Sequence, residues 1–357
     1  MITKQKMPLF LTLLLVMFMI ALAGCSSEQT GTKSETTSTE ESNKKTTKSD
    51  GTTTEYPIVI KHALGETTIE KKPERVATIQ WSNHDVALSL GVVPVGFSAA
   101  NYGVQDESGM LPWTADKIKD LGAETPTIFQ DTDGLDFEAV ADTNPDVILA
   151  AYSGITQEEY DTLSEIAPVI AYQTSPWVAS WREQVTYNSM AMGMEEEGKQ
   201  LIADTEKLIE EKVSKHSEIK GKKAAFVSMS ADDLSKFYIY TPDDPRGAFL
   251  SELGMEYPES ITSQITDPNN FYLEVSAENA DMLNDADILI SYGHKDTLAA
   301  LQADPILGKI PAIERGSIVI IEDNTPLAAA GTPSPLSIEY SIDEYLTLLS
   351  EAVSKIK

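Results

Sequence analysis

Hydrophobic residues between positions 56 and 172 recur in short runs separated by amphipathic stretches. The runs predict a hairpin over 56–70 and strands at 76–79, 92–96, 146–151 and 168–172. The stretches between them predict helices at 83–90, 136–141 and 157–166, the first of them capped by Ser82 and ended by Gly91. Strands that alternate with helices indicate a parallel sheet with helices on both faces.

The pattern changes between positions 180 and 219, where no strand-like run and no proline occur. Apolar residues at helical spacing, from Leu201 to Val213, predict one long helix over 195–218. A second alternating region predicts strands at 224–228, 237–240, 287–292 and 317–321, and helices at 247–253, 276–283 and 338–356. The sequence therefore predicts an α/β fold with two Rossmann-like lobes, at 56–178 and 221–357, bridged by one long α-helix within 179–220.

The first 24 residues have the layout of an export signal. Lys4 and Lys6 precede an apolar run over 7–23 that is short for a membrane span. The run ends in Leu22-Ala23-Gly24-Cys25, which contains the only cysteine of the chain. This box resembles the bacterial lipoprotein signal, which implies that Cys25 is lipidated and becomes the mature N-terminus. The alternative is an ordinary signal peptide or membrane anchor with an incidental cysteine.

Residues 25–55 are predicted to form a disordered tether, because the stretch from Ser26 to Glu55 has no aromatic or large aliphatic residue to bury. A flexible coil of about 30 residues reaches on the order of 30 Å from a bilayer. The net charge of −29 argues against nucleic acid as a partner and against charge-driven binding to anionic lipid. Contact with the membrane is therefore expected only through the lipid on Cys25.

Several segments of the body together carry a family resemblance. They are Val76-Ala-Thr-Ile-Gln-Trp81 with Leu90-Gly-Val-Val-Pro-Val-Gly96, Phe137-Glu138 before Asn144-Pro145-Asp146, Ile166-Ala-Pro168-Val-Ile-Ala-Tyr172, and Val275-Ser-Ala-Glu278 before Asp287-Ile-Leu-Ile290. In this order, behind a lipoprotein signal, they resemble the periplasmic-binding-type proteins that serve importers of ferric siderophores, haem and vitamin B12. The resemblance covers residues 56–357. It implies a monomer with a ligand cleft between two lobes, which delivers its ligand to the permease subunits of an ABC transporter.

Residues that directly follow predicted strands are the candidates for that cleft, because open α/β sheets bind ligands outside the carboxyl ends of their strands. The candidates are Trp81, Asn83, Tyr152, Trp177, Trp181, Arg182, Tyr240, Arg246 and Tyr292. Aromatic rings can cover an organic chelate, and Tyr, Trp and Arg side chains can donate to metal-bound oxygens. Trp177 and Trp181 share a face if their segment is helical. For any single aromatic residue, a place in the core at a lobe edge is an equal alternative.

The predicted cleft is poor in cations, with Arg182, Arg246 and Lys295 as the obvious ones. This favours a neutral or weakly charged ferric hydroxamate as the transported ligand over a highly anionic complex. Ferric catecholate, ferric citrate, haem and cobalamin remain alternatives for the same fold. No cofactor is expected, since the siderophore itself holds the iron.

Direct binding of zinc or manganese is a further alternative, which would need several histidines and carboxylates at one point. The histidines, His62, His84, His216 and His294, form no close pair, and we expect His62 and His216 at the surface. An enzyme is another alternative, but the chain has no nucleophile elbow and no Gly-rich phosphate loop. We therefore predict a binding protein and not an enzyme; a purely adhesive surface protein is the remaining alternative.

The resemblance also implies that one glutamate on each lobe pairs with arginines of the permease. The matching positions are Glu138 and Glu278, each near a predicted helix start that precedes a strand. A carboxylate there also gains from the helix dipole, which is the structural alternative. The predicted location is outside the cytoplasm, lipid-anchored to the cell membrane of a Gram-positive bacterium.

Overall fold

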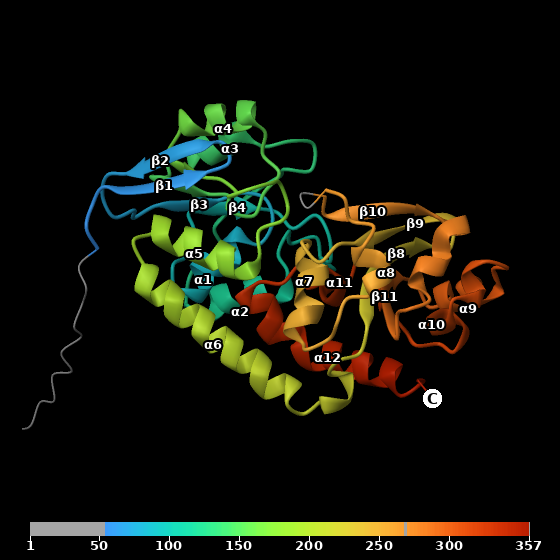
Figure 1. The fold of residues 1–357 in the computed structure, drawn as a ribbon. Coiled ribbons are helices and arrows are strands. Elements are labelled where there is room, and N and C mark those ends of the chain that lie inside the picture. Colours follow the sequence, from blue (N-terminus) through green and yellow to red (C-terminus); the bar gives the residue numbers. More distant parts are fainter. Residues whose placement is uncertain (1–53, 268–269, 357) are drawn as a thin grey trace, which may run out of the picture. The chain divides into compact units, whose positions relative to one another are not determined.

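The structure, a computed structural model, describes residues 54–267 and 270–356. Five short strands of the N-terminal half form one parallel sheet, which we call the N-terminal sheet (Figure 1). Its strands are β3 (Val76–Thr78), β4 (Gly96–Ser98), β5 (Thr127–Phe129), β6 (Val147–Leu149) and β7 (Val169–Ile170), in the order β5-β4-β3-β6-β7. The central strands β3, β4 and β6 are buried along their whole length, as their apolar sequences predict.

The hairpin predicted at the start of the body forms outside this sheet. It consists of β1 (Ile58–His62) and β2 (Gly65–Ile69), paired antiparallel. The helices of this half are α1 (Asn83–Ser89), α2 (Pro112–Asp120), α3 (Phe137–Asp142) and α4 (Gln157–Ser164). The sequence did not predict α2, and Ser82 precedes α1 without a side-chain cap because its hydroxyl donates to Gln184 Oε1 at 2.8 Å.

Two helices lead from the N-terminal sheet to the second half. They are α5 (Trp181–Ala191) and α6 (Glu195–Val213), followed by the 3₁₀ helix η1 (Ser217–Ile219). The sequence did not predict α5, although Ser180 and Glu183 form a capping box at its start. The prediction that one helix runs to residue 218 was wrong, because α6 ends at Val213 and the chain turns before η1.

The second half contains a five-stranded sheet, which we call the C-terminal sheet. Its strands are β8 (Ala224–Ser230), β9 (Asp233–Tyr240), β10 (Tyr272–Ser276), β11 (Ile288–Gly293) and β12 (Ile318–Glu322), in the order β10-β9-β8-β11-β12. Strands β8, β11 and β12 are parallel, whereas β9 runs antiparallel to both of its neighbours. The antiparallel place of β9 follows from its connection, because the two residues between β8 and β9 are too few for a crossover.

The helices of the second half are short except for the last. They are α7 (Pro245–Glu252), α8 (Glu259–Thr262), η2 (Ala277–Leu283), α9 (Thr297–Ala303), η3 (Leu307–Lys309), α10 (Pro311–Glu314), α11 (Pro326–Ala329) and α12 (Pro335–Val353). The predicted helix after Ser276 is the 3₁₀ helix η2, and Ser276 makes no side-chain cap. The last helix starts three residues earlier than predicted, where Ser334 caps it and Pro335 occupies its first turn.

Packing joins the two halves in addition to the chain through α6. Helix α12 contacts α1, α2 and α6, so the C-terminal helix returns to the N-terminal half (Figure 1). One buried cluster includes Val86 and Val185 from α1 and α5 together with Phe226 and Leu346 from β8 and α12. The arrangement of the two sheets is therefore held by a shared core.

The predicted signal peptide, tether and lipidated Cys25 lie outside the described residues. Within the described ranges, no helix combines the length and the hydropathy that crossing a membrane requires.

Candidate ligand-binding site

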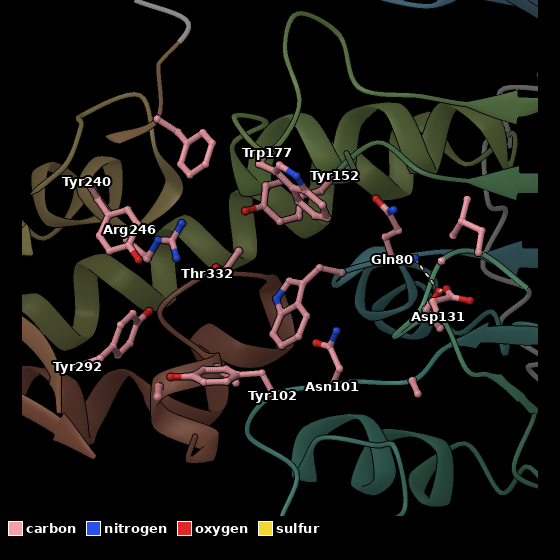
Figure 2. A pocket seen from close by; sticks show the side chains of 18 of the residues that line it. Gln80, Asn101, Tyr102, Asp131, Tyr152, Trp177, Tyr240, Arg246, Tyr292 and Thr332 are labelled. Atoms are coloured by element: carbon pink, nitrogen blue, oxygen red, sulfur yellow. Dashed lines mark hydrogen bonds between the residues drawn. The ribbon is translucent and has the colours of Figure 1, made fainter. Parts of the chain in front are cut away.

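A cavity of about 690 Å³ is lined by residues from both halves of the molecule (Figure 2). Six of the nine residues predicted for the cleft line it: Trp81, Tyr152, Trp177, Tyr240, Arg246 and Tyr292. Asn83, Trp181 and Arg182 do not contribute to this lining. The volume lies in the range typical of small-molecule sites.

A strained turn after β3 carries Trp81. Its neighbours Gln80 and Ser82 have φ angles of 57° and 59°, in the left-handed region that residues other than glycine rarely adopt. The backbone N–H of Gln80 donates to Ser98 Oγ at 2.7 Å. The side-chain oxygen of Gln80, Oε1, accepts from the backbone N–H of Gly154 at 2.6 Å. These bonds hold the turn so that Trp81 reaches the cavity. Such strain is common where a side chain must be positioned for function.

Asn83 has a structural role instead of the predicted place in the cavity. It is fully buried, and its amide group bonds both the nitrogen and the oxygen of Tyr152. Its Nδ2 also donates to Ile79 O at 2.9 Å. Asn83 therefore fastens the loop after β3 to the loop after β6. These loops carry Trp81 and Tyr152.

Tyr152 and Trp177 form one aromatic wall, with ring centroids 5.4 Å apart in an edge-to-face arrangement. Trp177 has a φ of 64° and precedes α5, so the segment from Trp177 to Trp181 is not helical and the two rings share no helix face. Gly154 lies against the Trp177 indole, where an added Cβ would come within 2.3 Å of Nε1. A glycine at 154 therefore permits the observed place of Trp177.

Trp181 and Arg182 begin α5 and point toward other helices. Trp181 is 1% exposed and donates through Nε1 to Glu252 Oε2 at 3.0 Å. Arg182 pairs with Glu206 at 2.7 Å and Glu252 at 2.8 Å, and its guanidinium lies 4.3 Å from the centre of the Trp181 ring. Arg182 thus lines a separate groove against α6 and α7.

The opposite wall comes from the C-terminal sheet and α7 (Figure 2). The Arg246 guanidinium carbon lies 3.8 Å from the centre of the Tyr240 ring. Phe226 on β8 packs against both Tyr240 and Tyr292, with ring centroids 5.7 and 5.0 Å away. Because β9 is antiparallel, its carboxyl end lies at the opposite edge from that of β11. The rule that ligands bind outside the carboxyl ends of parallel strands, here called the strand-end rule, therefore accounts for Tyr292 but not for Tyr240.

Arg246 forms a bidentate ion pair with Asp244. Its Nε donates to Asp244 Oδ1 at 2.7 Å and its Nη2 to Asp244 Oδ2 at 2.6 Å. Burial alone would lower the pKa of Arg246, but the hydrogen bonds and charge of Asp244 outweigh it and raise that pKa. The guanidinium is therefore always charged. The N–H groups of Arg246 that do not bind Asp244 can donate to other acceptors.

The tyrosines of the cavity are phenols at neutral pH. Burial raises the pKa of Tyr152, Tyr240 and Tyr292, and the charge of Arg246 offsets this only in part. A protonated phenol donates a hydrogen bond, whereas direct coordination of Fe³⁺ uses the phenolate. The tyrosines of this wall can therefore donate hydrogen bonds to oxygen atoms of a bound ligand.

Sequence reasoning missed part of the lining. The missed residues that bring polar or aromatic groups are Gln80, Ser98, Asn101, Tyr102, Asp131, Glu159, Phe271, Asp323 and Thr332. Tyr102 follows β4, Asp131 follows β5 and Asp323 follows β12, and the Tyr102 hydroxyl donates to Asp323. The strand-end rule would have found the first two if these three-residue strands had been predicted correctly.

The histidines do not converge on the cavity. His62 is buried and bonds Thr67 Oγ1 at 3.0 Å, so its predicted place at the surface was wrong. His84 is buried beside Asp85, and burial lowers its pKa. Among the described residues, no group of three or more His, Cys, Asp or Glu side chains could hold a metal ion.

The fold and cavity are those of a solute-binding protein. The chain belongs to the periplasmic binding protein family, whose model matches residues 76–325. This family consists of substrate-binding proteins, and the predicted family and fold class are confirmed.

Similar proteins include two curated relatives. The chain is 27% identical over 242 residues to the probable siderophore-binding lipoprotein YfiY of Bacillus subtilis, covering 66% of this chain and 69% of YfiY. It is 24% identical over 282 residues to the ferric enterobactin-binding periplasmic protein FepB of Escherichia coli, covering 76% of this chain and 86% of FepB.

A solved structure of PiaA from Streptococcus pneumoniae in complex with ferrichrome is more similar. The two chains are 55% identical, with a TM-score of 0.81. The match covers 84% of this chain and all of that one.

Proposed function

We propose that this protein captures a ferric siderophore, with a hydroxamate preferred, and delivers it to the permease of an ABC importer. The observation that carries the proposal is the cavity between the two sheets. Its walls combine aromatic faces with phenol and guanidinium donors. The similarity to PiaA, which was solved with ferrichrome, supports the hydroxamate class.

The proposed ligand-binding residues divide into two groups. Trp81, Trp177 and Phe271 would cover the organic part of the chelate with apolar surface. Tyr152, Tyr240, Tyr292 and Arg246 would donate hydrogen bonds toward oxygen atoms of the complex. Because the iron arrives fully coordinated by the siderophore, the protein acts as a carrier, without cofactor and without catalysis.

Two exposed glutamates are proposed to dock the permease. Glu138 lies in the first turn of α3 and Glu278 in the first turn of η2, and both are exposed. Within the described part of the chain, neither forms an ion pair. Charges at the rim of an interface govern docking rate and orientation more than affinity for the cargo.

The remaining parts of the proposal concern the N-terminus. We propose a signal peptide at 1–24, lipidation of Cys25 and a tether over 25–55, which would anchor a monomer outside the cytoplasm of a Gram-positive cell. The lobes would span 56–178 and 221–357, joined through 179–220. The relatives described above are a lipoprotein and a periplasmic protein, which supports the extracytoplasmic location.

Tryptophan fluorescence tests the ligand proposal. Titration with ferrichrome should quench emission, and Trp81→Phe and Trp177→Phe should each reduce the amplitude. Trp181→Phe is the matched control, because Trp181 is buried away from the cavity. Ferric catecholate, ferric citrate, haem and cobalamin complete the panel. Absence of a response to every ferric hydroxamate would remove the proposed function.

A further inference from the structure

The charged groups that line the cavity are unequal in number. Arg246 is the one cationic side chain among the described lining residues. Asp131, Glu159 and Asp323 bring three carboxylates to the same lining. A ligand in this cavity therefore meets more negative than positive side-chain charge before the surroundings of Arg246 are considered.

The charge of Arg246 is already balanced from within the protein. Asp244 is fully buried, and both of its carboxylate oxygens accept hydrogen bonds from the guanidinium. Oδ1 also accepts from the Arg246 amide at 2.8 Å, as the N-cap of α7. Asp244 does not line the cavity, so its negative charge remains beside the guanidinium when a ligand binds.

We infer that Asp244 is a specificity-determining residue that makes this cavity select neutral or cationic ferric complexes and reject polyanionic ones. This inference rests on the proposed function and adds the charge class of the ligand. The neutral Arg246–Asp244 pair can still donate hydrogen bonds to chelate oxygens. It supplies no net positive charge to offset the removal of a polyanion from water.

The carboxylates elsewhere in the lining act in the same direction. Asp131 lies across the cavity from Arg246 (Figure 2). It accepts hydrogen bonds from Ser98 Oγ and from the Asp136 amide. Burial raises the pKa of Asp131, because those hydrogen bonds do not fully compensate the loss of water around the carboxylate. An anionic ligand would add repulsion there, whereas a cationic group on a chelate would be stabilised.

The test compares ferrichrome, a neutral complex, with ferric enterobactin, a trianion, by titration of the folded protein. The key variant is Asp244→Asn, which keeps an N-cap acceptor and leaves the Arg246 charge unbalanced. Asp243→Asn is the matched control, because it removes the same charge one residue away at an exposed position. Thermal unfolding of each variant verifies that it is folded.

We expect the wild-type protein to bind ferrichrome at least about 100-fold more tightly than ferric enterobactin. Asp244→Asn should reduce the ratio of the two affinities, ferrichrome over ferric enterobactin, by about tenfold or more, chiefly because the trianion binds more tightly. Asp243→Asn should leave this affinity ratio unchanged. An unchanged ratio in folded Asp244→Asn, or equal wild-type affinities, overturns the inference. Absence of ferrichrome binding by the wild type overturns the proposed function instead.

A second variant covers the case in which Asp244→Asn does not fold. The double variant Asp131→Asn plus Glu159→Gln removes two lining carboxylates without altering the Arg246–Asp244 pair. The same inference predicts that the ratio narrows, and that the change shrinks at high salt because part of it is electrostatic. A ratio unaffected by this double variant, in folded protein, counts against charge selection in the cavity.

Discussion

Ser334, the residue that caps the C-terminal helix α12, donates a hydrogen bond to the buried carboxylate of Asp85 at 2.5 Å. Asp85 lies in α1, 249 residues earlier in the chain. The same carboxylate accepts from Trp113 Nε1 at 3.0 Å and from Thr114 Oγ1 at 3.2 Å. One acidic side chain thus connects α1, α2 and α12 beneath the cavity-lining turn that carries Trp81.

Replacement of Asp85 by alanine should destabilise the protein by about 3 kcal/mol or more. Three buried donors would lose their acceptor, and each unsatisfied group costs about 1–3 kcal/mol. Ser334→Ala should cost about 1 kcal/mol, the usual loss for an N-cap residue. Urea unfolding of both single variants and the double variant measures these costs, with Asp116→Ala as the exposed control on α2. Strictly additive effects in the double variant would contradict a direct Asp85–Ser334 interaction.

Arg182→Ala should leave siderophore affinity unchanged within about twofold, because its guanidinium pairs with Glu206 and Glu252 and lines no part of the cavity. The sequence alone predicts the opposite, a loss of about tenfold to a hundredfold in affinity. Stability should fall by about 0.5–1 kcal/mol, since the pairs are partly exposed. Fluorescence titration and thermal unfolding separate the two outcomes. A loss of affinity above tenfold with an intact fold would restore Arg182 to the site.

The rule that ligands bind at strand ends explains which site residues the sequence could provide. Trp81, Tyr152 and Tyr292 lie at or just after the ends of parallel strands, so their place followed from hydrophobic runs alone. Tyr102 and Asp131 were missed because the strand before Tyr102 was predicted at 92–96, whereas β4 spans Gly96–Ser98, and because no strand was predicted at β5.

Arg182 shows the limit of such reasoning more sharply. The capping box at Ser180 and Glu183 is visible in the sequence and places the start of α5 at Trp181. The face that α5 turns toward Glu252 depends on a residue about 70 positions away, which no local pattern encodes. Tyr240 ends β9, which pairs antiparallel with β8, so its place in the lining does not follow from the rule for parallel strands; that pairing is set by the short turn between the two strands.

Gly154→Ala should weaken siderophore binding by about tenfold. The free energy of unfolding should change much less than the free energy of binding. An added Cβ would come within 2.3 Å of the Trp177 indole, so this ring must move from the cavity wall. Ligand titration followed by the emission spectrum of the free protein tests this, because a displaced Trp177 emits from more polar surroundings. Gly122→Ala is a control for lost stability without movement of Trp177, because its φ of 65° strains an alanine while no atom lies against the added Cβ; its affinity should not change. Unchanged affinity would show that the wall adapts without cost.

The double variant Glu138→Ala plus Glu278→Ala should bind ferric siderophore normally and fail to support its uptake by cells. Both carboxylates are exposed, at the first turns of α3 and η2, and neither lines the cavity. Loss of two docking charges would reduce the rate and correct orientation of encounters with the permease. Cellular uptake of iron-labelled ferrichrome measures transport, and fluorescence titration of the purified variant measures binding. Glu158→Ala plus Glu259→Ala, which removes exposed first-turn glutamates from α4 and α8, is the matched control and should transport normally. Normal uptake by the Glu138 and Glu278 variant would exclude these residues as the docking pair, and an equal loss in the control would point to net charge instead of position.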